Sequence, residues 1–155
     1  FRRAAHPQTG LMPDYAEFDG TPRTMPWGNH DEFRYDAWRT LGNPALDWSW
    51  WRADSWQVEQ SNRVLRFLAS HGENVPDRYK IDGTPVSTDV NTPGLMAMAA
   101  VAALAADREV GQPWVQRLWD MPMPKGRLRY YDGLLTMLGL LQVSGHYRVY
   151  GPVTP

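Results

Sequence analysis

Cysteine is absent from this chain of 155 residues, so disulfide bonds and thiolate metal sites are excluded. The formal net charge is only −1 and the sequence pI is about 6.5, which gives no basic surface for a nucleic-acid partner. Long apolar runs are missing too: "GLMAMAAVAALAA" stops at Asp107, short of the roughly 18 residues of a membrane-spanning helix. We therefore expect neither a nucleic-acid nor a membrane partner, and the compartment, secreted or cytoplasmic, stays open.

An initiating methionine is also missing, because the chain opens with "FRRAAHPQTG" and enters a turn-rich segment directly. A chain of this length can bury one ordinary hydrophobic core. We therefore interpret residues 1–155 as a single partial domain that belongs to a longer protein.

Aromatic residues are abundant by contrast: eight Trp, seven Tyr and four Phe make up 12% of a sequence whose mean hydropathy is −0.53. Several tryptophans lie among polar residues, as in "MPWGNH" and "DWSWWRAD". Flat amphipathic rings beside Asp, Asn, Arg and His are typical of a sugar-binding cleft, where pyranose faces stack on the rings and hydroxyl groups find polar partners. The alternative is that each Trp is simply large and half-buried.

Hydrophobic periodicity predicts an all-α fold. Residues 1–31 are rich in Pro and Gly without a sustained period, so we expect a long loop there. The predicted helices span 32–42 (ending at Gly42 and Pro44), Asp54 as N-cap to Gly72, 93–106 after the N-cap Thr92, about Pro113 to just before Pro122, and 128–144. Only "YRVY" at 147–150 resembles a strand.

The predicted helix at 93–106 is apolar on all sides, which indicates burial between other helices. Five helices offer few neighbours for it, so the chain is interpreted as antiparallel helical hairpins with long loops, half of something larger. On its own, such a half would expose the apolar faces of 93–106 and 128–144. We therefore expect self-association, a complementary chain or poor solubility.

Few residue patterns suggest chemistry. The four histidines share no metal-binding spacing, and neither a phosphate-binding loop nor a nucleophile elbow is present, so no metal or cofactor is expected. Carboxylates in aromatic surroundings remain, and these are Asp14, Glu17, Asp19, Asp31, Glu32 and Asp36. Glycoside hydrolysis requires two carboxylates in a sugar-shaped cleft.

Asp36 is the strongest candidate among them. In "EFRYDAWRT" (32–40) it lies within a helical pattern of Phe33, Ala37 and Trp38, although aspartate is a poor residue in the middle of a helix. Arg39, one turn on, would favour the ionised carboxylate that a general base requires. The alternative is a surface i,i+3 ion pair worth only about 0.2–0.5 kcal/mol.

Five stretches of the sequence, taken in order, resemble glycoside hydrolase family 8. They are "HPQTGLMPDYAEFDGTP" (6–22), "FRYDAWRT" (33–40), "RYKIDGTP" (78–85), "GLMAMAAVAALA" (94–105) and "RYYDGLLTMLGLLQVSGHYRVY" (129–150). The resemblance covers nearly the whole chain. It is greatest to the branch that acts on xylan and xylo-oligosaccharides, which includes enzymes that release xylose from reducing ends.

This resemblance implies a fold, a mechanism and site residues. The family folds as an (α/α)6 barrel and inverts the anomeric configuration, and this chain would correspond to the C-terminal half. By position, Asp36 would be the general base, Arg39 would orient the sugar or the base, and Tyr35 would be the aromatic residue before the base. The tyrosines expected to line the cleft are Tyr15, Tyr130 and Tyr131, with plain packing as the alternative for each. On this interpretation the helix accepts Asp36 because the carboxylate must be rigidly placed beside the attacking water.

Two departures from the family pattern bear on activity. The family's general acid, a glutamate, and a further active-site aspartate belong to the N-terminal half, so the chain alone is expected to be inactive. At "STDVNTPG" (87–94), where the reducing-end exo-enzymes carry a histidine-bearing loop, this chain has Val90, Asn91 and Thr92. Endo-acting and exo-acting interpretations therefore both stay open.

The predicted function is inverting hydrolysis of β-1,4-xylosidic bonds in xylan or xylo-oligosaccharides, without metal or cofactor. Two alternatives are kept. One is a hydrolase of β-1,4-glucan or chitosan from the same family, and the other is a non-catalytic sugar-binding half barrel.

Overall fold

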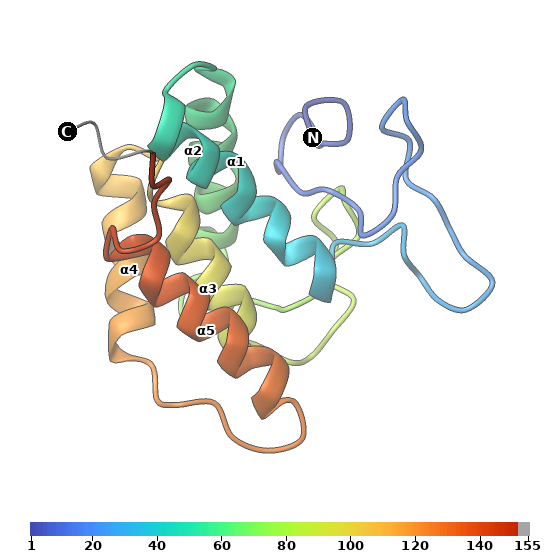
Figure 1. Cartoon of the computed structure of the whole chain (residues 1–155). Coiled ribbons are helices and arrows are strands. Elements are labelled where there is room, and N and C mark those ends of the chain that lie inside the picture. Colours follow the sequence, from blue (N-terminus) through green and yellow to red (C-terminus); the bar gives the residue numbers. More distant parts are fainter. Residues whose placement is uncertain (152–155) are drawn as a thin grey trace.

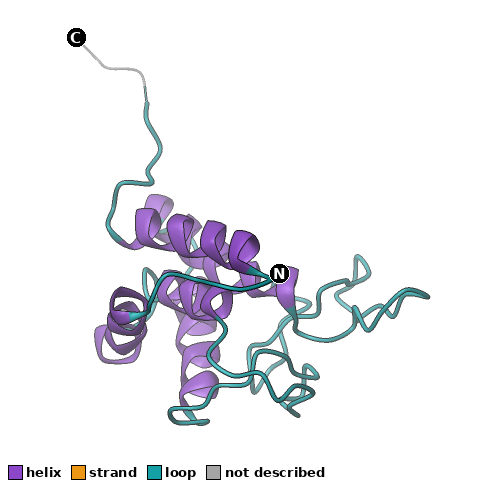
Figure 2. Cartoon of the chain, turned by 90° about the horizontal axis from the view of Figure 1, so that it is seen from below, coloured by secondary structure: helices purple, strands orange, loops and turns teal. Residues whose placement is uncertain are grey.

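Five α-helices form the body of the chain, as the sequence predicts. The computed structural model describes residues 1–151, and in that range it contains no named strand. The elements are a short 3-10 helix η1 (Tyr35–Trp38), α1 (Arg39–Trp51), α2 (Trp56–Ala69), α3 (Pro93–Ala102), α4 (Arg108–Asp120) and α5 (Arg129–Val143). Residues 1–31 form the expected long loop, held by turns and isolated bridges. Figure 2 shows the long loops extending to one side of the helices.

α3 is the centre of the core. Every residue from Gly94 to Ala102 is buried, and the helix packs chiefly against α5, α1 and α4. The prediction that a helix apolar on all sides lies between others is therefore confirmed. The expectation that this helix would present an exposed apolar face is wrong, because its three neighbours within the same chain already cover it.

The three helices α1, α3 and α5 begin at the same end of the molecule, while α2 and α4 run back along the outside (Figure 1). Contacts between their first turns support this arrangement, since Gly94 of α3 approaches both Trp38 and Asp132. The positive ends of three helix dipoles and their unpaired N–H groups therefore gather in one region.

Two prolines that were expected to mark helix ends lie inside helices instead. Pro44 was expected to follow the end of a helix, and Pro113 was expected to begin one. The helix predicted at 32–42 instead continues through Gly42 and Pro44 to Trp51. Pro44 removes one backbone hydrogen bond, but burial of Leu41 and Ala45 beside it against the core outweighs that loss.

α4 begins five residues before Pro113, at Arg108, because Asp107 occupies the N-cap position and its carbonyl accepts the first N–H groups. The predicted start at Pro113 is therefore wrong. α3 ends at Ala102, since residues 103–106 form turns, while α5 matches its prediction within one residue at each end.

The two residues predicted to cap α2 flank it, but neither occupies its predicted cap position, because the N-cap is Ser55 and the C-cap is Ser70. The Asp54 carboxylate accepts the N–H of Trp56 at 3.1 Å at the start of α2, although Ser55 occupies the N-cap position itself. Gly72 follows α2 with a φ of +65°, the left-handed conformation that favours glycine.

The C-terminal part of the chain corrects one prediction and supports another. "YRVY" at 147–150 forms no strand, since no neighbouring segment pairs with it in the described structure. α5 does expose an apolar stripe, as expected for the helix at 128–144. Its members recur at helical spacing and are Tyr130, Leu134, Met137 and Leu141.

None of the helices within 1–151 is long and apolar enough to span a bilayer.

Two helical glycines differ in what a side chain would meet there. A Cβ at Gly111 of α4 would lie 2.7 Å from the Cβ of Ala103, whereas one at Gly133 of α5 would meet nothing within 4 Å. We expect Gly111→Ala to lower the free energy of unfolding by about 1–3 kcal/mol through overpacking. Gly133→Ala should raise it by about 0.5–1 kcal/mol by reducing the entropy of the unfolded chain. Urea midpoints measure both signs, and a Gly111→Ala midpoint at or above the wild-type value would contradict this packing.

Candidate active site

The backbone at the start of α1 places Asp36 differently from the sequence prediction. Asp36 lies in η1, in the first turn of the helical segment, and not in the middle of a helix. A carboxylate in a first turn is favoured by the helix dipole, so the predicted local penalty is absent. The strained residue is instead Tyr35, whose φ of +33° is rare for a residue with a side chain.

Two donors hold one oxygen of the Asp36 carboxylate. Arg39 Nη2 lies 3.0 Å from Oδ1, and the Tyr131 hydroxyl donates to the same oxygen at 3.3 Å. The Asp36 side chain is 55% exposed, so solvent and solutes can reach it. An ion pair this exposed adds at most about 1 kcal/mol to stability, and its geometry suggests orientation of the carboxylate as its role.

Tyr131 comes from the first turn of α5, 95 residues away in sequence. Burial, and after it the negative charge of Asp36, raise the pKa of the Tyr131 phenol above its ordinary value, and the nearby Arg39 offsets part of that rise. The hydroxyl therefore stays protonated well into alkaline solution and can go on donating its hydrogen bond.

Aromatic rings pack beside these polar groups. The ring of the fully buried Trp38 lies 6.0 Å from that of Tyr131 and 5.5 Å from that of Tyr35. The guanidinium groups of Arg34 and Arg78 lie 5.1 and 5.8 Å from the centre of the Tyr35 ring, within range of cation–π attraction. The half-buried Tyr35 ring is thus fixed beside Asp36.

The six predicted site residues divide into two groups. Asp36 forms an ion pair with Arg39 and accepts a hydrogen bond from Tyr131, and Tyr35 is adjacent to them. Tyr15 lies outside this set of contacts, stacked on the ring of His30 at 4.3 Å. Tyr130 is 78% exposed on the outer stripe of α5, and the described structure gives it no bond to Asp36.

His30 in turn contacts Asp14, with its Nδ1 2.6 Å from the Asp14 carboxylate, so the Tyr15 ring has a firm support. The sequence assigned no individual role to His30 or Asp14. Their contact depends on the loop that returns residue 30 to residue 15, where the N–H of Tyr15 donates to the His30 carbonyl, and periodicity does not reveal such a return.

Sequence reasoning missed a pair of buried carboxyl groups beneath the site, Asp77 and Asp132. The Asp132 carboxylate accepts the N–H of Gly94 at 3.2 Å, and that of Asp77 accepts the Thr92 hydroxyl at 3.3 Å. Burial raises the pKa of Asp132, the bond from Gly94 lowers it in part, and the charge of Asp77 raises it again. A signal was available in the sequence, because position 132 begins the buried stripe of α5 that continues at 135, 136 and 139.

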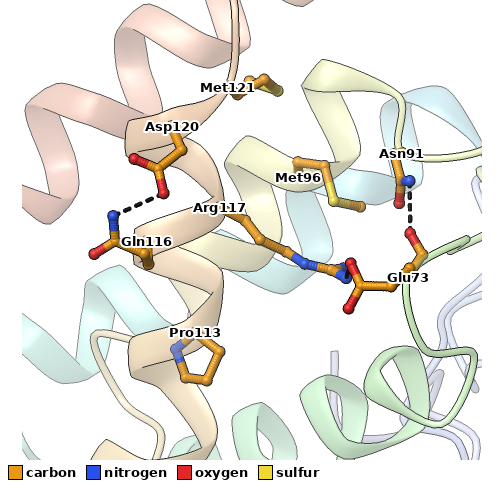
Figure 3. Close-up of a pocket in the computed structure, with 8 residues that line it drawn as sticks. All are labelled: Glu73, Asn91, Met96, Pro113, Gln116, Arg117, Asp120 and Met121. Atoms are coloured by element: carbon orange, nitrogen blue, oxygen red, sulfur yellow. Dashed lines mark hydrogen bonds and ion pairs between the residues drawn. The ribbon is translucent and has the colours of Figure 1, made fainter.

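A separate hollow of about 460 Å³ lies between α4 and the loops before α3 (Figure 3). Arg117 crosses it to the Glu73 carboxylate at 3.2 Å, and Gln116 bonds Asp120 at 2.8 Å. None of its eight lining residues is aromatic, and none is a predicted site residue. It therefore does not resemble a pyranose-stacking cleft. In residues 1–151, no group of three or more His, Cys, Asp or Glu side chains is placed to hold a metal ion.

Substitutions at Asp36 and Arg39 should shift the titration of Tyr131 in opposite directions. Asp36→Asn removes a negative charge that disfavours the phenolate, so the pKa of Tyr131 should fall. Arg39→Gln removes a positive charge that favours it, so that pKa should rise. Tyrosine ¹³Cζ NMR, with the Tyr131 signal assigned by Tyr131→Phe, follows the onset of each titration. Superimposable curves for the three proteins would contradict the described contacts.

Comparison with known proteins places this geometry in a family. The chain is 45% identical to the reducing-end xylose-releasing exo-oligoxylanase Rex8A of Paenibacillus barcinonensis, over 96% of this chain and 40% of the relative. A reducing-end xylose-releasing exo-oligoxylanase of Halalkalibacterium halodurans is 36% identical, over 96% and 38%. The chain thus spans about 40% of the length of these relatives.

Solved structures agree with the fold. The xylose complex of Rex8A superposes with a TM-score of 0.90 at 43% identity, covering 97% of this chain and 40% of that one. A xylobiose complex of a family 8 enzyme from Teredinibacter turnerae gives 0.90 at 40% identity, covering 94% and 37%. The five helices are therefore part of an (α/α)6 barrel. The model of the glycosyl hydrolases family 8 matches residues 1–145, and the chain belongs to that family.

Proposed function

We propose that this chain carries the general base of an inverting hydrolase of β-1,4-xylosidic bonds, with Asp36 as the base. The observation that carries the proposal is the Asp36 carboxylate itself. It is open to solvent, yet it is held at one oxygen by Arg39 and Tyr131. The proposed substrate is xylan or a xylo-oligosaccharide.

The geometry supports a division of labour between the two carboxylate oxygens. Within the described residues, the ion pair from Arg39 and the hydrogen bond from Tyr131 both reach Oδ1, which leaves Oδ2 to accept a proton from water. The ion pair with the Arg39 guanidinium orients the carboxylate that acts as the base in this proposal. The water oxygen attacks the anomeric carbon from the face opposite the leaving group while Asp36 takes its proton, and the configuration inverts.

The leaving-group oxygen needs a proton from a second carboxyl group, which stands about 6.5–9.5 Å from the base in inverting enzymes. We propose that this general acid belongs to a further part of the barrel, supplied either in the same polypeptide or as a second chain. The 155 residues alone should then bind sugar without turnover.

Aromatic rings around Asp36 supply the sugar contacts of this proposal. Tyr35 lies directly before the base, and Tyr131 presents a neutral hydroxyl that can donate to a sugar oxygen or to Asp36. Tyr15 and Tyr130 are proposed to extend the cleft further from the scissile bond. Both expose much of their surface, 39% and 78%, which leaves room for a stacked pyranose.

The relatives favour xylan over glucan. Three exo-oligoxylanases are 35–45% identical to the chain, whereas endoglucanases and a β-glucanase are 24–27% identical. A hydrolase of β-1,4-glucan or chitosan therefore remains an alternative with less support. A non-catalytic sugar-binding protein is the other alternative, and it would bind oligosaccharides with no turnover in any combination.

Hydrolysis of xylohexaose, followed by anomer-resolved NMR, tests the proposal. The chain is assayed alone and together with a polypeptide that comprises the part of Rex8A outside the matched region. We expect turnover only in the combination, with the α-anomer formed first at the new reducing end. Asp36→Asn should slow it by roughly 10²–10⁴-fold, the usual contribution of a general base.

Asp120→Asn is the matched control, because Asp120 lines the separate hollow of Glu73 and Arg117 and bonds only Gln116 among the described residues. Its rate should equal that of the wild type. Initial formation of the β-anomer, or full activity in Asp36→Asn, would contradict the assignment of the base.

The products of the same reaction separate the endo from the exo mode. Segment 87–94 carries Val90, Asn91 and Thr92 and no histidine, whereas the family resemblance puts a histidine-bearing loop here in the reducing-end exo-enzymes. We therefore expect cleavage within xylohexaose, which gives xylobiose, xylotriose and xylotetraose. Early products of xylose and xylopentaose alone would establish reducing-end exo action and overturn this expectation. Chromatography of samples taken before a tenth of the substrate is consumed distinguishes the two.

A further inference from the structure

The buried carboxyl groups of Asp77 and Asp132 have no part in the proposed reaction, yet both bind the beginning of α3. Asp132 accepts the N–H of Gly94 at 3.2 Å, and Asp77 accepts the hydroxyl of Thr92 at 3.3 Å. Asp132 is only 5% exposed and Asp77 only 3%. The first turn of α3 is therefore held by side chains from two other segments, because its own Thr92 makes no side-chain cap.

The contact at Gly94 is very close. A Cβ built there would lie 2.8 Å from the Trp38 ring, 2.9 Å from Asp132 Oδ1 and 2.9 Å from a methyl group of Leu135. The start of α3 thus touches η1 on one side and the first turn of α5 on the other. Small displacements of any of these elements would be transmitted to the others, since packed interiors have little free space.

Asp132 directly follows Tyr131 in the first turn of α5, so whatever fixes Asp132 also fixes the backbone from which the Tyr131 hydroxyl reaches Asp36. Trp38 fixes the Tyr131 ring from the other side and is itself held by the hydrogen bond from its Nε1 to the Asp77 carbonyl at 2.9 Å. We propose that Asp132 is a positioning residue of the site, which sets the Tyr131 hydroxyl against the Asp36 carboxylate by holding the Gly94 N–H.

A carboxyl group at this place is costly, which argues that it has a purpose. The other buried positions of the same stripe are Leu135, Thr136 and Gly139. An apolar residue at 132 would satisfy burial but leave the Gly94 N–H unpaired, at a penalty of about 1–3 kcal/mol. Asparagine would keep the acceptor oxygen. The proposal therefore predicts different outcomes for Asn and Ala at position 132.

The experiment uses the 155-residue chain and two readouts, the Tyr131 titration by ¹³Cζ NMR and the affinity for xylohexaose by calorimetry. Asp132→Ala should shift the Tyr131 titration to lower pH and weaken binding roughly three- to tenfold, the equivalent of one lost hydrogen bond. Asp132→Asn removes the same charge, which by itself raises the pKa of Tyr131, but keeps the acceptor oxygen for the Gly94 N–H. It should therefore keep the affinity within about twofold of the wild type and shift the Tyr131 titration less than Asp132→Ala does. The role of Asp36 in hydrolysis rests on the proposed function, but the titration readout does not.

Asp54→Ala is the matched control, since Asp54 also accepts a backbone N–H at a helix start, but at α2. It should lower stability and leave Tyr131 and binding unchanged. Should Asp132→Ala fail to fold, Gly94→Ala serves as the second variant, because its Cβ would crowd Asp132 Oδ1. Gly111→Ala is its control, being equally crowded but against Ala103. Both control variants should lower stability without touching the contact between Asp132 and Gly94, so they separate the effect of that contact from a general loss of stability.

The proposal would be overturned by an unchanged Tyr131 titration in folded Gly94→Ala, or by one in folded Asp132→Ala that is shifted no further than the lost charge shifts it in Asp132→Asn. Asp132 would then be a purely structural residue. Equal effects of Asn and Ala at position 132 would overturn it as well. A shifted Tyr131 titration in a protein that binds no xylohexaose in any form would uphold the positioning role and count against the proposed function.

Discussion

Burial of α3 on every side is the constraint on which the rest of the structure depends. Its small residues allow α1, α4 and α5 to approach closely, with Gly139 of α5 placed directly against Ala97. Because a helix apolar all round must be enclosed, its neighbours cannot splay apart without exposing it to water. The relative placement of α1 and α5 follows, and with it the meeting of residues 36 and 131. The single hydrogen bond between these residues is weak, but the packing that brings them together is cooperative.

The proposed site is a consequence of three helices that begin in one place. First turns carry unpaired N–H groups and the positive ends of dipoles, so they suit carboxylates. Asp36 occupies such a turn at the surface, and Asp132 occupies another in the interior. Both carboxylates thus use the same feature of a helix start. Asp36 acts in the proposed reaction, and Asp132 holds the residues of the site in place. The strained backbone of Tyr35 directly precedes Asp36, and such local strain is commonly stored at functional sites.

Much of this could be predicted from the sequence, but only where the signal is local. The apolar run of α3, the stripe of α5 and the spacing of Asp36 to Arg39 are all read within a few residues of each other. The helix limits predicted from Pro44 and Pro113 were wrong, because burial of the surrounding side chains outweighs the local preference against proline inside a helix. The Tyr131 bond to Asp36 and the pairing of Asp132 with Gly94 join residues 95 and 38 positions apart, and no periodicity reports such distances. The family resemblance supplied Tyr131 as a candidate but not its contact.

The central claim is that sugar binds where α1, α3 and α5 begin. Amide chemical-shift mapping of the chain with xylohexaose tests it most directly, because it needs neither turnover nor the rest of the barrel. The account predicts perturbed signals at Tyr35, Asp36, Arg39 and Tyr131, which saturate together with one affinity. Perturbations confined to the hollow of Glu73 and Arg117, or none at millimolar xylohexaose, would contradict it.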